Sequence, residues 1–432
     1  MWDISSTDSV FRESEKLSDS PKYGCYVHVP FCAGEKCPYC GFYSIRYSPE
    51  SATEYIETVL QHARSTEVPV IDTLYFGGGT PTSLSPEAIS RLITKLKSIL
   101  PVEDNSEITV EANPETVDNE TTEALFEAGV NRVSLGAQSF RPAQLKTLGR
   151  RHDIDKIYEA YEILHKYPFS LSFDLIFGIP RQSVRDWEIS LDKAIELGPD
   201  HISIYCLSFE SGTPFADALR MGAIYPVGDD VEREMYDLAS SRLTVADYGR
   251  YEISNFAKPK CESRHNLKYW TGAGYIAFGP AAHGYIPGPP NWTRYAFPSN
   301  LEEYTLLINS GREPLAAVEK LDLQKRSAEF LMLRLRLDHG FSEEEITAHL
   351  PELEPAEYIA ALQPLIDDNK ILLEAGQVRI APRDMFISDA IIFRAVELTD
   401  PYIKEIVTKR KSAGSETSML GYLTRFRFLG GS

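Results

Sequence analysis

The chain has 432 residues, 43% of them hydrophobic and 25% charged, with a net charge of −19, which indicates a folded globular protein of roughly two or three domains. This acidity argues against general nucleic-acid binding, which needs a basic surface. The apolar runs are shorter than the roughly 18 residues that a membrane span needs. The polar, acidic extension 1–22 does not resemble a signal peptide, so we expect a cytoplasmic protein with reduced thiols.

From residue 23 to about residue 225, short β-branched and aromatic runs alternate with helical patterns. Strands are predicted at residues 25–31, 72–77, 107–112, 131–137, 170–178 and 201–208, and helices near 50–66, 86–99, 118–128, 153–166 and 183–197. Right-handed crossovers between such units give a parallel sheet, and these units are too few for a closed eight-stranded barrel. The sequence therefore predicts an α/β fold, an open (β/α)6 barrel that corresponds to part of a TIM barrel.

The pattern changes after about residue 225. Residues 226–300 are rich in aromatics, Gly and Pro, and we expect long ordered loops beside the barrel mouth. Residues 301–398 predict a mainly helical C-terminal domain with a small hairpin at 371–380. The tail 399–432 could meet an acidic partner or a membrane surface, or it could simply be solvated. Its basic residues are Lys404, Lys409, Arg410, Lys411, Arg425 and Arg427.

Three of the six cysteines lie close together in FCAGEKCPYC, at Cys32, Cys37 and Cys40. A thioredoxin-type pair in CPYC would leave Cys32 without a role. A structural zinc site needs four ligands, and the other candidates, Cys25 and His28, lie in a predicted strand. The remaining interpretation is a [4Fe–4S] cluster held by three thiolates, with one iron open to a further ligand.

Other unusual residues follow the predicted strand ends, and the carboxyl ends of parallel strands form the site in such folds. They are the glycine-rich GGGTPT at 77–82, Glu111, Asn113, Gln138, Asp174 and Glu210. An open iron could chelate the amino and carboxylate groups of S-adenosylmethionine, whose sulfonium a reduced cluster would cleave to a 5′-deoxyadenosyl radical. Carboxylates could hold the ribose, and Arg150 the methionine carboxylate. Taken singly, each residue could equally be solvated or a helix cap, and GGGTPT a tight turn.

Seven motifs together carry a family resemblance: YVHVPFC…CPYC, FGGGTPT, EANPETV, VSLGAQSF, LGRRHD, DLIFGIPRQS and HNLKYW. Over about residues 23–395 the chain resembles the radical S-adenosylmethionine (radical SAM) family of oxygen-independent coproporphyrinogen III oxidases and their HemW-type heme-chaperone relatives. The resemblance implies the cluster ligands Cys32, Cys37 and Cys40. It also implies cofactor contacts from Tyr26, Tyr39, Gly78, Gly79, Thr80, Glu111, Gln138, Arg150 and Asp174.

The HNLKYW motif is implicated in heme binding in the chaperone branch. His265 could ligate heme iron while Tyr269 and Trp270 flank the macrocycle, or all three could simply pack in the interior. His283 is a second candidate.

Two features bear on the branch. Cys40 is followed by Gly41 and Phe42 where the oxidases carry Cys-x-Cys, and the N-terminal segment is short, so we expect a heme chaperone that passes heme to apo-haemoproteins. The alternative is the oxidase, an oxidoreductase that decarboxylates porphyrinogen propionates to vinyl groups. In either case the resemblance implies heme or porphyrinogen as a partner and an electron donor such as flavodoxin or ferredoxin. Four residues separate Cys32 from Cys37, one more than in the family, and nothing in the sequence explains the extra residue.

Overall fold

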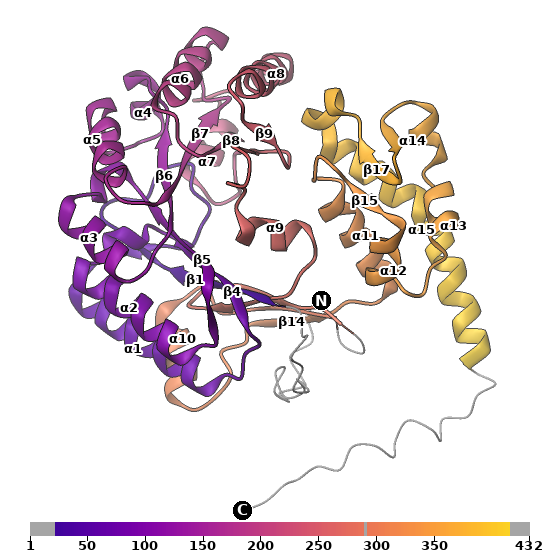
Figure 1. Ribbon diagram of the computed structural model, residues 1–432, viewed down its shortest axis with the longest axis horizontal. Coiled ribbons are helices and arrows are strands. Elements are labelled where there is room, and N and C mark those ends of the chain that lie inside the picture. Colours follow the sequence, from indigo (N-terminus) through magenta and orange to yellow (C-terminus); the bar gives the residue numbers. More distant parts are fainter. Residues whose placement is uncertain (1–21, 289–291, 415–432) are drawn as a thin grey trace, which may run out of the picture. The chain divides into compact units, whose positions relative to one another are not determined.

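The computed structural model describes residues 22–288 and 292–414, which form two compact units, Met1–Lys320 and Leu321–Ser432 (Figure 1). The predicted N-terminal extension, apart from its last residue, and the end of the predicted tail lie outside the described residues. Among the described residues, no helix has the length and apolarity to cross a bilayer.

The first unit is built on six parallel strands that neighbour one another in chain order. They are β1 (Tyr23–Val29), β4 (Ile71–Gly78), β5 (Val102–Ala112), β6 (Arg132–Gln138), β7 (Ser170–Phe177) and β8 (His201–Cys206). The helices between them are α1 (Pro49–Ser65), α2 (Pro86–Ile99), α3 (Asn119–Glu127), the short α4 (Pro142–Thr147), α5 (Ile154–Leu164) and α6 (Val184–Leu197). Figure 1 shows these helices on the outer face of the curved sheet. The predicted (β/α)6 arrangement is confirmed.

Local sequence signals explain where these helices begin and end. Ser48 and Ser85 accept hydrogen bonds from backbone N–H groups of the first turns of α1 and α2, and a proline follows each cap. Ser183 forms a capping box at the start of α6, and Gly198 ends that helix in the left-handed conformation. The apolar faces that these helices present to the sheet form the core.

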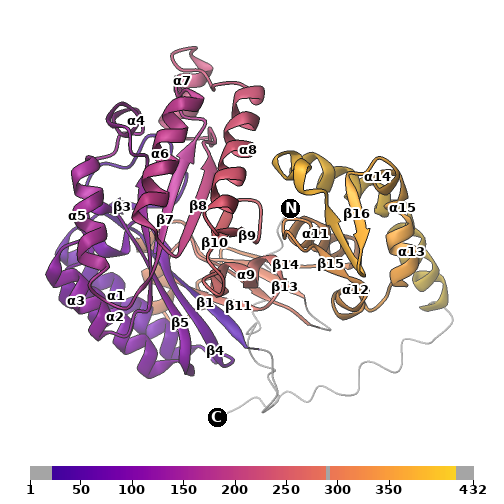
Figure 2. The same cartoon turned by 45° about the horizontal axis from the view of Figure 1, so that its top comes forward.

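The segment 226–300 is mostly regular structure, whereas the sequence predicted loops there. The helix α7 (Pro214–Arg220) precedes this segment. The segment itself holds the helices α8 (Asp229–Val245) and α9 (Arg264–Trp270) and the strands β9 (Gly249–Arg250), β10 (Asn255–Ala257), β11 (Tyr275–Phe278), β12 (His283–Ile286) and β13 (Thr293–Ala296). β11 pairs parallel with β1, and β10 pairs antiparallel with β8, so both edges of the barrel sheet are extended (Figure 2). Together with β14 (Ala317–Lys320), the sheet has 12 strands. The run Tyr275–Phe278 is wholly buried, and its aromatic and β-branched residues are of the types enriched in strands.

Residues 301–320 also belong to the first unit, although the sequence placed the start of the helical domain at 301. The helix α10 (Leu301–Asn309) packs on α1, where Thr58 and Gln61 donate hydrogen bonds to Thr305 and to the carbonyl of Ile308.

The second unit is mainly helical, as predicted. Its helices are α11 (Leu323–Arg334), α12 (Glu343–His349), α13 (Pro355–Ala360), α14 (Gln363–Asp367) and α15 (Ser388–Gly414). A small sheet of β15 (Phe341–Ser342), β17 (Gln377–Ile380) and β16 (Ile371–Glu374) contains the predicted hairpin, whose turn residues Ala375 and Gly376 have positive φ. Part of the predicted basic tail is helical, since α15 carries the ion pairs Lys404–Asp400 and Lys409–Glu405.

Candidate cofactor site

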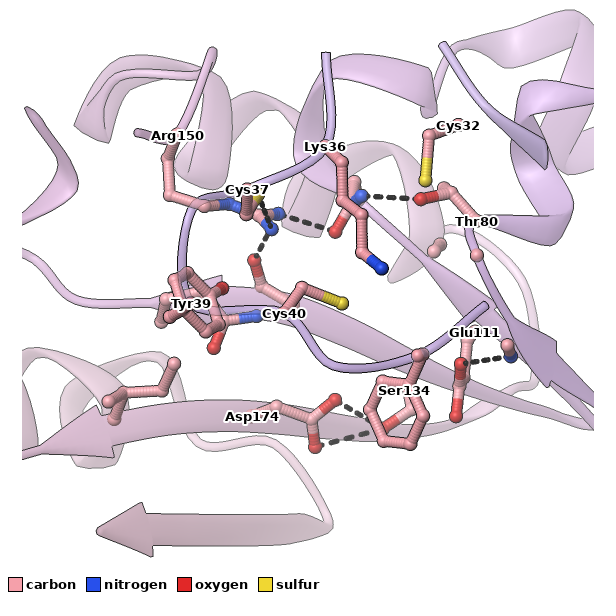
Figure 3. Close-up of a pocket in the computed structure, with 18 of the residues that line it drawn as sticks. Cys32, Lys36, Cys37, Tyr39, Cys40, Thr80, Glu111, Ser134, Arg150 and Asp174 are labelled. Atoms are coloured by element: carbon pink, nitrogen blue, oxygen red, sulfur yellow. Dashed lines mark hydrogen bonds between the residues drawn. The ribbon is translucent and has the colours of Figure 1, made fainter. Parts of the chain in front are cut away.

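A cavity of about 710 Å³ opens at the carboxyl ends of the barrel strands. Its volume lies within the range typical of cofactor pockets. Of the residues that the sequence proposed for the site, those lining this cavity are Cys32, Cys37, Tyr39, Cys40, Gly78, Gly79, Thr80, Glu111, Asn113, Gln138, Arg150, Asp174 and Glu210. Figure 3 shows the cysteine loop together with Glu111 and Asp174 around this space.

The loop that carries the three thiols is fixed at its base. β2 (Phe31–Cys32) pairs with β3 (Ile45–Arg46), and the N–H of Tyr47 donates to the carbonyl of Cys32 at 3.1 Å. The three thiols are free, and among the described residues no three metal-ligating side chains converge on a single point. A cubane cluster bonds each thiolate to a different iron, so its ligands surround a volume and need no common point. The donor set therefore fits a cluster better than a single ion.

Gly78 and Gly79 are required by the protein's own packing. Gly78 has a φ of 112°, and a Cβ there would lie 2.6 Å from the His28 ring. A Cβ on Gly79 would lie 2.4 Å from the carbonyl oxygen of Phe31. The N–H of Thr80 donates to that same carbonyl at 2.6 Å, so the turn after β4 is bonded to the residue next to Cys32. The glycine-rich motif thereby positions the first thiol.

A chain of hydrogen bonds ties Cys37 to the neighbouring strands. Arg150 Nη1 lies 3.5 Å from the Cys37 sulfur, and Arg150 Nη2 donates to Asn113 Oδ1 and to the carbonyl of Gly136 (Figure 3). Asn113 Nδ2 in turn donates to Thr80 Oγ1 at 2.7 Å. The sequence proposed Arg150 as the partner of the methionine carboxylate, and in the structure its guanidinium also fixes the position of Cys37. The Nε of Arg150 is buried and has no hydrogen-bond partner among residues 22–288 and 292–414.

Two carboxyl groups of partly buried residues, Glu111 and Asp174, lie near the cysteine loop in the cavity (Figure 3). Glu111 accepts hydrogen bonds from the Tyr75 hydroxyl at 2.7 Å and from the Gly78 N–H at 3.2 Å. Burial, with a smaller contribution from the Asp174 charge, raises the pKa of Glu111 to about 7. The Ser134 hydroxyl lies 3.1 Å from both oxygens of Asp174, whose pKa burial also raises. Near neutral pH, Glu111 can therefore either accept or donate a hydrogen bond to a ligand.

Gln138 and Tyr39 lie at the rim. Gln138 ends β6 with a φ of 63° after an irregularity in the pairing with β7, a strained conformation of the kind that recurs at ligand sites. The Tyr39 ring packs on Phe215, with ring centroids 6.2 Å apart. This contact holds the cysteine loop against the apolar cluster behind it.

Tyr26 and the two heme candidates, His265 and the exposed His283, do not line the cavity. Tyr26 stacks on Tyr75, and its hydroxyl lies 3.2 Å from His28 Nδ1. His265 is 1% exposed, with Nδ1 2.9 Å from the Thr73 hydroxyl and Nε2 2.9 Å from the Tyr269 hydroxyl. Both of its ring nitrogens are therefore engaged, and burial lowers the pKa of the imidazole to about 3. These contacts match the reading in which the HNLKYW aromatics pack in the interior.

Sequence reasoning missed several cavity residues. On β6 the residues Arg132, Ser134 and Gly136, at alternate positions before the predicted Gln138, all line the cavity. The period of two in a strand was the signal that could have found them, because alternate side chains share one face. Asn266 of the HNLKYW motif also lines the cavity, next to a histidine that does not.

Comparison with known proteins agrees with this geometry. The model of the radical SAM superfamily matches residues 26–194. A relative named heme chaperone HemW, from Bacillus subtilis strain 168, is 35% identical over 323 residues, which are 73% of this chain and 84% of the relative. Another of the same name, from Mycobacterium tuberculosis H37Rv, is 32% identical over 378 residues, or 86% of this chain and 94% of the relative.

The solved structure of coproporphyrinogen III oxidase HemN from Escherichia coli has a TM-score of 0.74 and 20% identity, covering 88% of this chain and 91% of that one. At this identity the likeness shows a shared fold. Membership of the radical SAM superfamily implies a [4Fe–4S] cluster and S-adenosylmethionine, and the three free thiols at the cavity fit that cluster. The chain belongs to the HemW-type family of radical SAM proteins.

Proposed function

We propose that this protein binds heme and transfers it to apo-haemoproteins. The observation that carries the proposal is the similarity, over most of the chain, to proteins named heme chaperones. The cavity supports it, because one space brings together the three thiols and the groups suited to the cofactor. The cluster would be held by Cys32, Cys37 and Cys40.

The cluster with S-adenosylmethionine would supply one-electron chemistry at the cavity. The chain's own residues have separate roles. Arg150 contacts the Cys37 sulfur and donates a hydrogen bond to Asn113, and it thereby fixes the loop around Cys37. Glu111 and Asp174 offer oxygens to the hydroxyl and amino groups of the cofactor. We further infer an external electron donor such as flavodoxin or ferredoxin, and a cytoplasmic location.

The second candidate is the oxidase, which the fold shared with HemN favours. Against it stand Gly41 and Phe42, at the place where the oxidases carry a further cysteine. The Phe42 side chain lines the cavity and is 68% exposed. An exposed aromatic ring at a cavity mouth suits a flat apolar cargo, whereas a cysteine there would serve chemistry.

Anaerobic reconstitution separates the two candidates. The reconstituted protein is titrated with heme and followed by its absorbance, and is separately incubated with coproporphyrinogen III, S-adenosylmethionine and a reductant. We expect saturable binding of heme and no protoporphyrinogen IX. Multiple turnovers to protoporphyrinogen IX would overturn the chaperone proposal, and so would the absence of heme binding.

A further inference from the structure

The inner end of the cavity holds a buried arginine that no group in the described part of the chain neutralises directly. Arg132 begins β6, is 3% exposed and lines the cavity. Among the described residues its guanidinium makes no hydrogen bond or ion pair, and its Nε is buried without a partner. A buried, unpaired guanidinium carries a large desolvation cost, which a bound anion would offset.

The acids near Arg132 are bonded to other groups. Glu111 accepts from Tyr75 and Gly78, and the Ser134 hydroxyl lies within hydrogen-bond distance of both oxygens of Asp174. Their charges act on Arg132 only at longer range. The guanidinium donors therefore stay available to something that enters the cavity.

A second polar group joins Arg132 at this end. Asn266 lines the cavity from α9, and among the described residues its carboxamide makes no hydrogen bond. The helix α9 closes the amino-terminal ends of the strands, since Glu107 of β5 accepts from the His265 N–H at 2.9 Å and Lys268 pairs with Asp72 of β4 at 2.7 Å. His265 holds this helix through Thr73, so the motif histidine positions its neighbour Asn266.

We propose that Arg132 and Asn266 form a carboxylate-binding subsite at the inner end of the cavity. A planar guanidinium fork pairs with a carboxylate through two parallel hydrogen bonds, and a carboxamide can donate a further one. If heme is the cargo, as proposed above, a propionate supplies this carboxylate.

Distance favours the cargo over the cofactor as the source. β6 spans seven residues, so its ends lie about 20 Å apart at about 3.3 Å per residue. The cysteine loop lies at the Gln138 end of the cavity, and Arg132 begins the strand at the other end. A methionine carboxylate held at the cluster would therefore lie far from Arg132.

The test compares ligands with and without carboxylates on the reconstituted protein. Heme and its dimethyl ester are titrated into the wild type, Arg132→Met and Asn266→Ala. Arg141→Met, at an ion pair with Asp186 outside the cavity, is the matched control. We expect Arg132→Met to bind heme at least about 10-fold more weakly, and Asn266→Ala to show a smaller loss. Binding of the ester should be unchanged in both variants.

Stability supplies an independent readout. Because Arg132 is buried without a partner, Arg132→Met should keep or raise the melting temperature of the cofactor-free protein. Equal heme affinity in wild type and Arg132→Met, or an equal loss for heme and ester, would overturn the subsite as a propionate site.

A parallel titration with S-adenosylmethionine and its decarboxylated analogue tests whether the carboxylate at the subsite comes from the cofactor instead of heme. If Arg132→Met binds S-adenosylmethionine more weakly but binds the decarboxylated analogue as the wild type does, the subsite binds the carboxylate of the cofactor. If the wild type binds neither heme nor the ester, the proposed function fails, and the cofactor titration alone decides the subsite. If Arg132→Met changes the binding of neither pair of ligands, the proposed subsite is overturned.

Discussion

Glu111 connects the pH dependence of stability to the site. Burial raises its pKa to about 7 in the folded protein, against 4.5 for an ordinary glutamate. The folded state therefore holds this proton to higher pH than the unfolded chain does. The associated stability is fully present below about pH 4.5 and is lost as the pH rises through about 7.

We therefore expect the free energy of unfolding of the cofactor-free protein to fall by up to about 3 kcal/mol between about pH 5 and pH 8. Glu111→Gln should remove most of this slope, leaving the part due to Asp174, whose pKa is also raised. Denaturant titrations across this pH range measure it, with the exposed Glu123→Gln as control. An unchanged slope in Glu111→Gln would contradict the assignment.

The cysteine loop gives a second prediction at this scale. Cys37→Ser should abolish the stable [4Fe–4S] cluster, because a hydroxyl is a poor ligand for iron in this setting. Iron and sulfide content after anaerobic reconstitution, with the visible absorbance, measure the loss. Cys261→Ser, outside the cavity, should retain the full cluster. A full cluster in Cys37→Ser would show that the loop has another role.

Single residues were predictable where spacing carries chemistry. Cys32, Cys37 and Cys40 were found because three thiols so close together in a long chain rarely serve packing alone. Arg132 was not found, because an arginine at the start of a strand resembles a surface residue until the sheet closes around it. Arg150 was proposed for a ligand, yet its contacts with Cys37 and Asn113 depend on tertiary structure that sequence spacing does not contain.

Among the elements, β4 and the cysteine loop are coupled through Gly79. We expect Gly79→Ala to destabilise the protein by about 2 kcal/mol, because the new methyl group would meet the carbonyl of Phe31 at 2.4 Å. The variant should also bind less iron, since that contact positions Cys32. Gly249→Ala, whose nearest atom would lie at 3.8 Å, should have little effect on either measurement. Normal stability in Gly79→Ala would refute the coupling.

The helix α9 depends on His265. His265→Ala should lower the free energy of unfolding by about 3 kcal/mol, because Thr73 and Tyr269 lose their partner and the stacking on Tyr75 disappears. The exposed His283→Ala should leave stability almost unchanged. The prediction that His265 ligates heme iron gives the opposite pattern, with stability retained and the heme absorbance maximum shifted.

The barrel elements were predictable because apolar runs and helix caps alternate regularly in the sequence. The edge strands were not, because β9 to β13 are short, and β11 and β10 join the barrel sheet by pairing with the distant strands β1 and β8. The run Tyr275–Phe278, for example, is only four residues long and lies in a segment rich in Gly and Pro, so the sequence predicted a loop there. Its parallel pairing with β1 is a tertiary event that periodicity does not report.

At the scale of the whole molecule, the first unit contains the complete cavity, since every residue that lines it precedes Lys320. The sheet extends beyond the barrel at both edges, and α9 closes its inner end. One cavity therefore has the cysteine loop at its mouth and, at its base, an arginine without a hydrogen-bond partner among the described residues. This arrangement suits a ligand with an apolar body and carboxylate arms.

The most direct test of heme transfer is a chase experiment. Heme-loaded, reconstituted protein is mixed anaerobically with an apo-globin, and the absorbance of the holo-globin is followed over time. We predict transfer faster than that from heme-loaded serum albumin, and slower transfer from the cluster-deficient Cys37→Ser protein. Heme that stays on the protein, or a transfer rate equal to that from albumin, would contradict the account.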